Sequence, residues 1–288
     1  MRMSNSPFIR LIEAEDPIFE VWNILKELWR SEGGLKEYFS LESQCSLFEQ
    51  KLNKVFFEFY RYLYNAIKGS TLRFSLPLII VDGMSLREGN LLLQDLRDKG
   101  YSVTSYGYSF SALPSTTSAF REKLNVKYVE IKSGRIPSEI DFKSPVWLSF
   151  PDEILHHAAA LIPLDEAYEK TRKILFEVLD RMEGGEVTIV SDHGYIVIDD
   201  VWPLSESDRR FLKSIFGAQR FSKNNEIEPN KLKSLRRIPE DRSYVFVDEQ
   251  YSYVKGRYFW PISGYGRKIA HGGLSLMECI VPLIRVRI

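Results

Sequence analysis

The sequence predicts an α/β protein in which a largely parallel sheet lies between layers of helices. Beyond residue 73, short apolar runs typical of strands covered on both faces alternate with stretches of helical periodicity. Before that point, apolar residues recur only at helical spacing. We therefore expect an N-terminal helical segment over residues 1–72, followed by a three-layer α/β/α sandwich over residues 73–288.

Residues 17–67 are predicted to be helical, with a break at Gly33 and Gly34. On both sides of the break, apolar residues recur every three or four positions, as on one face of a helix. They are Ile18, Val21, Trp22, Ile24, Leu25 and Leu28 before it, and Leu47, Leu52, Val55, Phe56, Phe59 and Leu63 after it.

A strand followed by a helix opens the second region. Residues 76–81 form a continuous apolar run that ends at Asp82. Ser85 and Glu88 then match a capping box, so a helix is expected from there to about Gly100. Further strands are predicted at residues 101–106, 126–131, 145–150 and 186–191, with a helix over 167–182 that stops at Gly184 and Gly185.

The last third of the chain has a less regular pattern. Residues 244–247 and 253–259 predict a hairpin. Residues 280–288 are expected to return to the sheet near an edge, where Pro282 is tolerated.

Composition excludes several classes of protein. Lys plus Arg and Asp plus Glu both number 39, so no net charge draws the chain toward nucleic acid or a membrane. Cys45 and Cys279 match neither a zinc spacing nor a disulfide framework, which suits a reducing compartment. Residues 1–10 lack the apolar core of a signal peptide, and no apolar run is long enough to cross a bilayer. We expect a soluble, cytoplasmic protein.

Polar residues follow two of the predicted strands. Asp82 and Asp192 lie at the carboxyl ends of strands, where open α/β sheets bind ligands, so they are expected to share one crevice. His193 directly follows Asp192, and a carboxylate oxygen with a ring nitrogen can bind one divalent ion. An Asp-His dipeptide alone is a weak signal.

Two further histidines occur in patterns that suit a metal. Asp152 and His156 are four residues apart, which places both on one face of a helix. A helix-capping aspartate beside an ordinary histidine explains that spacing equally well, and His157 is expected to be a bystander. His271 precedes Gly272 and Gly273, which permit a tight turn, and a second capping box follows at Ser275 and Glu278.

Thr116 and Thr117 lie in a loop that enters a helix. A hydroxyl there feels the positive end of the helix dipole, and a metal ion would make it a competent nucleophile. A threonine that merely caps the helix is the simpler interpretation. The sequence leaves both residues open as the nucleophile.

Taken in order, these residues resemble the alkaline phosphatase superfamily, in particular its PglZ-domain branch, over about residues 74–288. The resemblance is carried by Asp82, by Thr117 in Leu-Pro-Ser-Thr-Thr, by Asp152-x-x-x-His156, by Asp192-His193-Gly194 and by His271-Gly-Gly-Leu-Ser-Leu. It implies an alkaline phosphatase-like sandwich and two divalent metal ions, zinc or alternatively manganese. One ion would be bound by Asp82, Thr117, Asp192 and His193, and the other by Asp152, His156 and His271.

The resemblance also implies a metal-dependent phosphodiesterase or phosphatase in which Thr117 attacks phosphorus. Arg87, Arg121 and Arg267 are expected to neutralise phosphate oxygens, although cations at helix ends are more often solvated. A locally basic stretch within residues 213–237 favours a nucleotide or oligonucleotide substrate, while its interspersed acids favour a solvated surface.

Two alternatives remain open. PglZ proteins occur in BREX-type phage defence, so the chain is alternatively a metal-binding assembly component with little turnover, whose N-terminal helices bind a protein partner. A sulfatase-like activity is disfavoured, because sulfatases of this superfamily convert a Cys or Ser to formylglycine where this chain has Thr117.

Overall fold

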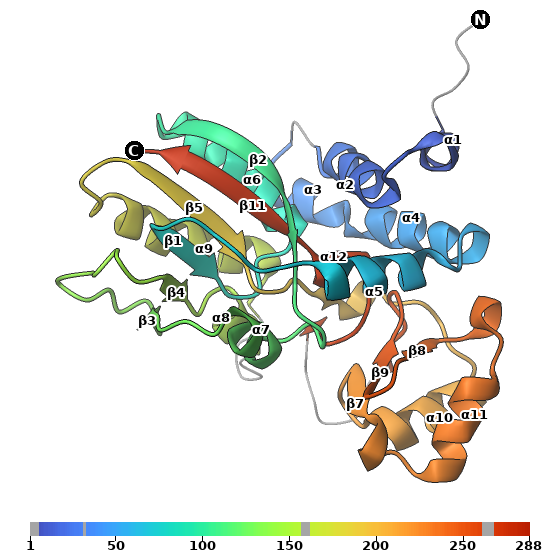
Figure 1. Ribbon diagram of the computed structural model, residues 1–288. Coiled ribbons are helices and arrows are strands. Elements are labelled where there is room, and N and C mark those ends of the chain that lie inside the picture. Colours follow the sequence, from blue (N-terminus) through green and yellow to red (C-terminus); the bar gives the residue numbers. More distant parts are fainter. Residues whose placement is uncertain (1–5, 31–32, 157–161, 261–267) are drawn as a thin grey trace, which may run out of the picture.

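A six-stranded sheet forms the centre of the computed structural model, which describes residues 6–30, 33–156, 162–260 and 268–288 (Figure 1). The strand order is β2-β11-β5-β1-β4-β3. The strands are β1 (Leu78–Val81), β2 (Ser102–Phe110), β3 (Val129–Ile131), β4 (Val146–Leu148), β5 (Glu186–Ser191) and β11 (Ile280–Arg287).

Most of this sheet is parallel. β1 pairs in parallel with β4 and β5, and β3 pairs in parallel with β4. β11 is antiparallel to both β5 and β2, so within the central sheet it alone runs against the other strands. The predicted α/β class and the largely parallel sheet are confirmed. Among the described residues, no helix combines the length and apolar character that crossing a bilayer requires.

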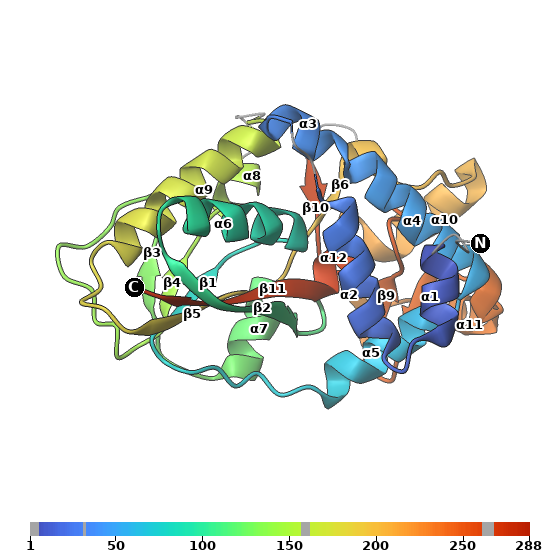
Figure 2. The ribbon, with the colours of Figure 1, turned by 90° about the horizontal axis from the view of Figure 1, so that it is seen from above.

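Helices pack against the sheet through two apolar clusters. α6 (Leu86–Asp98) and α9 (Leu164–Leu179) cover one face, where their leucines meet the side chains of β1, β4 and β5. α7 (Thr117–Leu124) lies on the opposite face (Figure 2). Its Phe120 packs there with Ile80 and Trp147. α6 begins at the predicted capping box of Ser85 and Glu88. The complete three-layer sandwich stays a prediction.

The N-terminal segment is helical, as expected, but it contains more helices than its apolar pattern indicated. The helices are α1 (Pro7–Glu13), α2 (Pro17–Leu28), α3 (Leu35–Ser40), α4 (Glu42–Val55) and α5 (Phe59–Gly69). The side chain of Asp16 caps α2 by accepting from the backbone N–H groups of Ile18 and Phe19.

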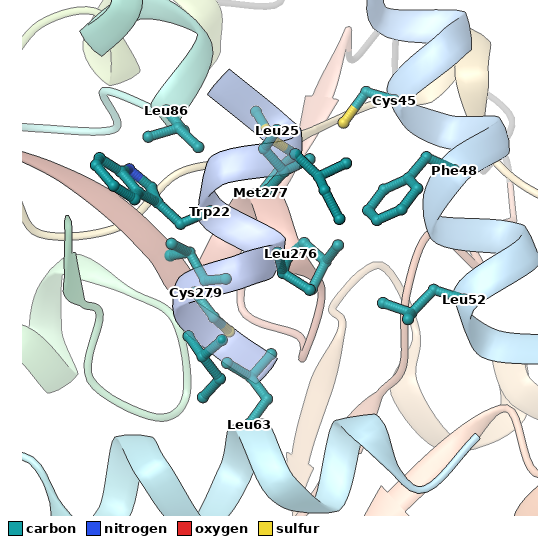
Figure 3. Close-up of a cluster of buried hydrophobic side chains, with 14 of the residues drawn as sticks. Trp22, Leu25, Cys45, Phe48, Leu52, Leu63, Leu86, Leu276, Met277 and Cys279 are labelled. Atoms are coloured by element: carbon teal, nitrogen blue, oxygen red, sulfur yellow. The ribbon is translucent and has the colours of Figure 1, made fainter. Parts of the chain in front are cut away.

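These helices share a hydrophobic core with the rest of the chain. Trp22 and Leu25 of α2 and Phe48 of α4 pack in one cluster with Leu86 of α6 and Met277 of α12 (Leu276–Cys279) (Figure 3). The boundary at residue 72 stays a prediction, but the two regions are joined by this cluster.

Between β5 and β11 the chain forms a smaller lobe, drawn in orange in Figure 1. It contains η1 (Ile198–Asp200), α10 (Glu206–Phe216), β7 (Phe221–Lys223), η2 (Asn224–Glu226), α11 (Pro229–Arg237), η3 (Glu240–Arg242), β8 (Val245–Val247) and β9 (Tyr251–Val254). In this lobe β7, β9 and β8 form a three-stranded sheet, and β6 (Ile196–Val197) and β10 (Ile269–Ala270) form a separate two-stranded sheet.

The predicted hairpin exists, with a shifted second strand. β8 matches its first half, whereas β9 ends at Val254 rather than continuing to residue 259. The chain turns at Gly256, whose φ of +50° is incompatible with a strand. β11 lies one strand in from the edge of the sheet and pairs with β2 on one side and β5 on the other. Its pairing with β5 begins at Leu283, so Pro282 lies just before that pairing.

Candidate metal centre

Three neighbouring strands bring three carboxylates to one edge of the sheet. Asp82 follows β1, and Asp192 follows β5, whose last residue pairs with the last residue of β1. Asp152 begins α8 (Asp152–His156), which follows β4 on the other side of β1. Parallel pairing therefore makes these three aspartates neighbours, although they are far apart in sequence.

A first group of ligand atoms comes from Asp82, Asp192 and His193, which lie within 4.8 Å of one another. The hydroxyl of Thr117, the first residue of α7, lies beside them. It donates to Asp82 Oδ1 at 3.1 Å and is also 3.1 Å from His193 Nε2. The nucleophile and the first ligand set predicted from the resemblance are thus in contact.

A second group comprises Asp152, His193 and His271, again within 4.8 Å. His156 adjoins this group, with its Nε2 at 2.9 Å from His271 Nε2 and 3.2 Å from Asp152 Oδ1. The rings of His193 and His271 stack at a centroid distance of 4.2 Å. His193 therefore belongs to both groups, whereas the resemblance assigned it to one.

The ring nitrogens are arranged as in metal-binding histidines. His193 Nδ1 lies 3.0 Å from the carbonyl oxygen of Gly194, and His271 Nδ1 lies 3.1 Å from that of Ser115. A carbonyl oxygen only accepts, so each Nδ1 carries a proton, and each Nε2 is the nitrogen that faces the cluster. In metal-bound histidines, the N–H of the second ring nitrogen usually donates a hydrogen bond in this way.

Two carboxylate oxygens also lack a well-aligned hydrogen-bond donor among the described residues. Asp192 Oδ2 and Asp152 Oδ1 are buried and accept no well-aligned hydrogen bond among the described residues. Buried polar atoms are normally paired, and a divalent cation would satisfy both. The residues present therefore fit metal ions held by oxygen and imidazole nitrogen.

The electrostatics of the cluster point the same way. Burial, together with the charges of Asp192 and Asp152, raises the pKa of Asp82 well above its usual range. Burial also raises the pKa of Asp192. For His193, burial alone would lower the pKa, but the carboxylates of Asp192, Asp152 and Asp82 raise it to about 9. Burial and the neighbouring His193 lower the pKa of His271 to about 3. Crowded carboxylates of this kind are stabilised by a bound cation.

The three hydroxyls of the Ser-Thr-Thr run have different partners. Ser115 Oγ donates to the carbonyl of Gly273 at 2.8 Å and accepts from the N–H of Gly272. Thr116 Oγ1 caps α7 by accepting from the N–H of Ala119 at 3.3 Å. Of the three, Thr117 is the residue whose hydroxyl contacts the carboxylates.

Several supporting residues were not predicted from the sequence. The N–H of Gly83, where φ is +74°, donates to Asp192 Oδ1 at 3.0 Å. Trp147 Nε1 donates to Asp82 Oδ2 at 3.0 Å. Glu278 accepts from the N–H of Gly273 at 2.9 Å and pairs with the buried Arg220. Of the second predicted capping box, the hydrogen bond from the N–H of Glu278 to Ser275 Oγ is therefore formed, but the side chain of Glu278 is bound elsewhere. The sequence shows a tryptophan within the apolar run 145–150, but only the pairing of the strands places this residue beside Asp82.

The arginines predicted to bind substrate have other roles where the structure describes them. Arg87 is fully buried and pairs with Glu42 and Glu88, so its guanidinium is not accessible to a substrate. Arg121 pairs with Glu130 at 2.7 Å and lies over the ring of Trp147. Arg267, like His157, lies outside the described residues.

Two comparisons show which known proteins this chain is similar to. A family profile described as the BREX system PglZ alkaline phosphatase-like domain matches residues 151–286. The chain is 28% identical over 142 residues to an alkaline phosphatase-like protein PglZ of Bacillus cereus (strain H3081.97). That match covers 46% of this chain and 16% of the relative's length. Asp152, His156, Asp192, His193 and His271 lie within the profile match, whereas Asp82 and Thr117 precede it.

Proposed function

Because the chain is a PglZ-domain protein of the alkaline phosphatase superfamily, we propose that it is a zinc-dependent phosphohydrolase acting on phosphodiesters or nucleotides. Its nucleophile is Thr117. The observation that supports this most directly is the position of the Thr117 hydroxyl, 3.1 Å from both Asp82 Oδ1 and His193 Nε2. The family name of the matching profile suggests a role in BREX-type phage defence.

Two ion sites follow from the ligand groups. Asp82, Asp192 and His193 would hold the ion next to Thr117, and Asp152, His156 and His271 would hold the other. When bound, the ions would supply Lewis-acid stabilisation for the entering and leaving oxygens, with manganese as an alternative to zinc.

The chain's own residues carry the transfer. The hydroxyl proton of Thr117 points at Asp82 Oδ1, which is placed to accept it as Oγ forms a bond to phosphorus. The bond from phosphorus to the leaving alcohol breaks, and that oxygen takes a proton from a water molecule, which becomes hydroxide. The hydroxide then attacks the phosphothreonine, its oxygen leaves on the phosphate, and Thr117 Oγ regains its proton from Asp82.

Elemental analysis combined with hydrolysis of bis-p-nitrophenyl phosphate and p-nitrophenyl phosphate tests this proposal. Two divalent ions per chain are expected, with turnover that falls by a factor on the order of 10³ or more in Thr117→Val. Thr116→Val is the matched control and should retain turnover within a few-fold. The proposal would be contradicted if elemental analysis found no divalent ion in the wild type, or if the two variants were equally active.

The alternative of an assembly component is favoured by a different observation. Apolar side chains on the N-terminal helices are exposed, among them Ile12 at 69% and Val55 at 60%. Where such side chains form a contiguous patch, they mark an interaction site. A phage-protection assay separates the two roles. If the chain is an assembly component, Thr117→Val should keep protection, whereas the double variant Ile12→Glu with Val55→Glu should abolish it. If the chain acts as an enzyme, Thr117→Val should abolish protection.

A further inference from the structure

The indole of Trp147 contacts the proposed metal centre through one of its ligands, Asp82. Trp147 lies in the middle of β4, is fully buried, and donates its ring N–H to Asp82 Oδ2 at 3.0 Å. No metal-ligand role is available to an indole N–H, since it is a donor only. Its effect on the centre therefore acts through Asp82.

The two oxygens of Asp82 have separate partners. Oδ1 accepts from Thr117 at 3.1 Å and lies 3.8 Å from His193 Nε2, whereas Oδ2 faces the indole. The terminal torsion of an aspartate is broad, so the chain alone does not fix the plane of its carboxylate. A hydrogen bond to one oxygen fixes that plane and, with it, the position from which the other oxygen meets the nucleophile and the ion.

The indole itself is held in place. Trp147 is in register with Ile80 of β1 on one side and with Glu130 of β3 on the other. The guanidinium of Arg121 lies 4.4 Å from its ring centroid and is tied by an ion pair to Glu130. Strand pairing and this stacked cation leave the ring little freedom, which is what a positioning group requires.

We propose that Trp147 is a positioning residue of the metal centre, which holds Asp82 through its indole N–H so that Oδ1 faces Thr117 and the adjacent ion. Arg121, expected from the sequence to bind phosphate, acts instead as the clamp on that indole. This inference rests on the proposed function, because it assigns Asp82 to a metal ion.

The chain contains a closely matched control. Trp29 is 2% exposed, and the guanidinium of Arg87 lies 5.5 Å from its ring centroid. Its indole N–H, however, has no hydrogen-bond partner among the described residues. Trp147→Phe and Trp29→Phe therefore remove the same atoms from similar surroundings, and only the first removes a bond to a ligand.

The test measures zinc affinity by competition with a chromophoric chelator for the wild type and both variants. Trp147→Phe should weaken one of the two sites by about 10 to 100-fold, while Trp29→Phe stays within about threefold. Turnover should fall in Trp147→Phe mainly through kcat, with KM changing less, because the substrate does not contact the indole. Thermal unfolding of the metal-free variants should be similar.

A spectroscopic measurement separates positioning from general packing. In protein labelled with ¹⁵N at tryptophan, the indole resonance absent from Trp147→Phe should shift when zinc is added to the wild type. The resonance absent from Trp29→Phe should not. If Trp147→Phe does not fold, Arg121→Met, at a side chain that is 30% exposed, should still weaken zinc binding severalfold.

The outcomes are distinguishable. Equal zinc affinity in Trp147→Phe and Trp29→Phe would overturn the positioning role but not the proposed function. The same holds if the indole resonance of Trp147 does not shift when zinc is added. Wild-type protein that binds no divalent ion overturns both.

Discussion

At the scale of single residues, the cluster is an unstable arrangement without a cation. Asp82, Asp152 and Asp192 are carboxylates at one sheet edge, and Asp192 is fully buried. Burial and neighbouring charges raise the pKa of Asp82 and of Asp192, so keeping these two carboxylates ionised opposes folding, and ion binding would reverse this effect. Stability should therefore depend on metal in a way that identifies the ligands.

Replacing Asp192 by Asn tests this dependence. Zinc at about 100 times its Kd should stabilise the wild type by about 2.7 kcal/mol for each occupied site, because an ion that binds only the folded state shifts the equilibrium. Asp192→Asn should lose most of the increment from the site next to Thr117 and keep that from the other site, while its metal-free form is as stable as the wild type or more so. Thermal unfolding with zinc and with a chelator measures both.

An exposed carboxylate serves as the control. Asp180, whose side chain is 52% exposed, should keep the full zinc increment when changed to Asn. A full zinc increment in Asp192→Asn would remove this residue from the ligand set.

Lys255, which belongs to neither ligand group, also makes stability depend on pH. Burial lowers the pKa of Lys255 from 10.5 to about 8, while its ammonium donates to the carbonyl of Glu240. Between these values the unfolded chain binds the proton and the folded chain has released it, so stability from this residue rises with pH. Across pH 8 to 10 the rise should be about 2 kcal/mol.

The comparison requires a variant because buried thiols oppose this trend. Burial raises the pKa of Cys45 to about 12, which lowers stability as pH rises through the same range. Urea unfolding at pH 8, 9 and 10 should show that Lys255→Met loses the rising contribution. Parallel pH profiles for wild type and variant would show that Lys255 is not responsible.

At the scale of elements, the loop after β5 depends on close backbone packing. The N–H of Gly194 donates to the carbonyl of Glu278 at 3.1 Å, which ties the Asp192-His193 loop to α12. A Cβ at Gly194 would overlap the carbonyl oxygen of Met277 and lie 2.9 Å from Ser85 Cβ. The glycine is required by this contact rather than by its φ angle.

Gly194→Ala should therefore destabilise the protein by about 3 kcal/mol, since overpacking of backbone against backbone cannot be relieved by a rotamer change. It should also weaken zinc binding by displacing His193. Gly107→Ala is the control, because a Cβ there meets nothing within 4 Å and alanine is favoured over glycine within a strand. Equal urea midpoints for the two variants would contradict this explanation.

Elements with a strong local signal could be predicted, and those that depend on partners could not. The run 186–191 became β5 with the same bounds, and the capping box at Ser85 began α6. The second strand of the hairpin was misplaced because Gly256 turns the chain within an apolar stretch. The helical region after Gly34 divides into three helices, a division that periodicity alone does not reveal.

At the scale of the whole molecule, buried ion pairs connect the N-terminal helices to the rest of the chain. Glu42 of α4 pairs with Arg87 of α6 and with Arg257, and Glu49 pairs with Arg257 at 3.0 Å. All four side chains are at most 3% exposed. Separating the regions would leave buried charges without partners as well as exposing the apolar cluster they share.

Removing one carboxylate from this network should be costly. Glu42→Gln is expected to destabilise the protein by about 3 to 5 kcal/mol, because two buried guanidinium groups lose a charged partner. Glu37→Gln, at an exposed position of α3, should change stability by less than about 0.5 kcal/mol. Chemical denaturation of both variants measures the difference, and a small effect in Glu42→Gln would argue for separable regions.

The sequence by itself determined the α/β class, the strands that end at Asp82 and Asp192, and the residue types able to bind metal, because these depend on local periodicity and chemistry. Only the tertiary structure decided that Thr117 rather than Thr116 contacts the carboxylates, that His193 belongs to both ligand groups, and that Trp147 meets Asp82. It also showed that Arg87 is buried in an ion network. These facts depend on which strands are neighbours and which side chains they bring together, and such long-range pairings are not encoded in any single stretch of sequence.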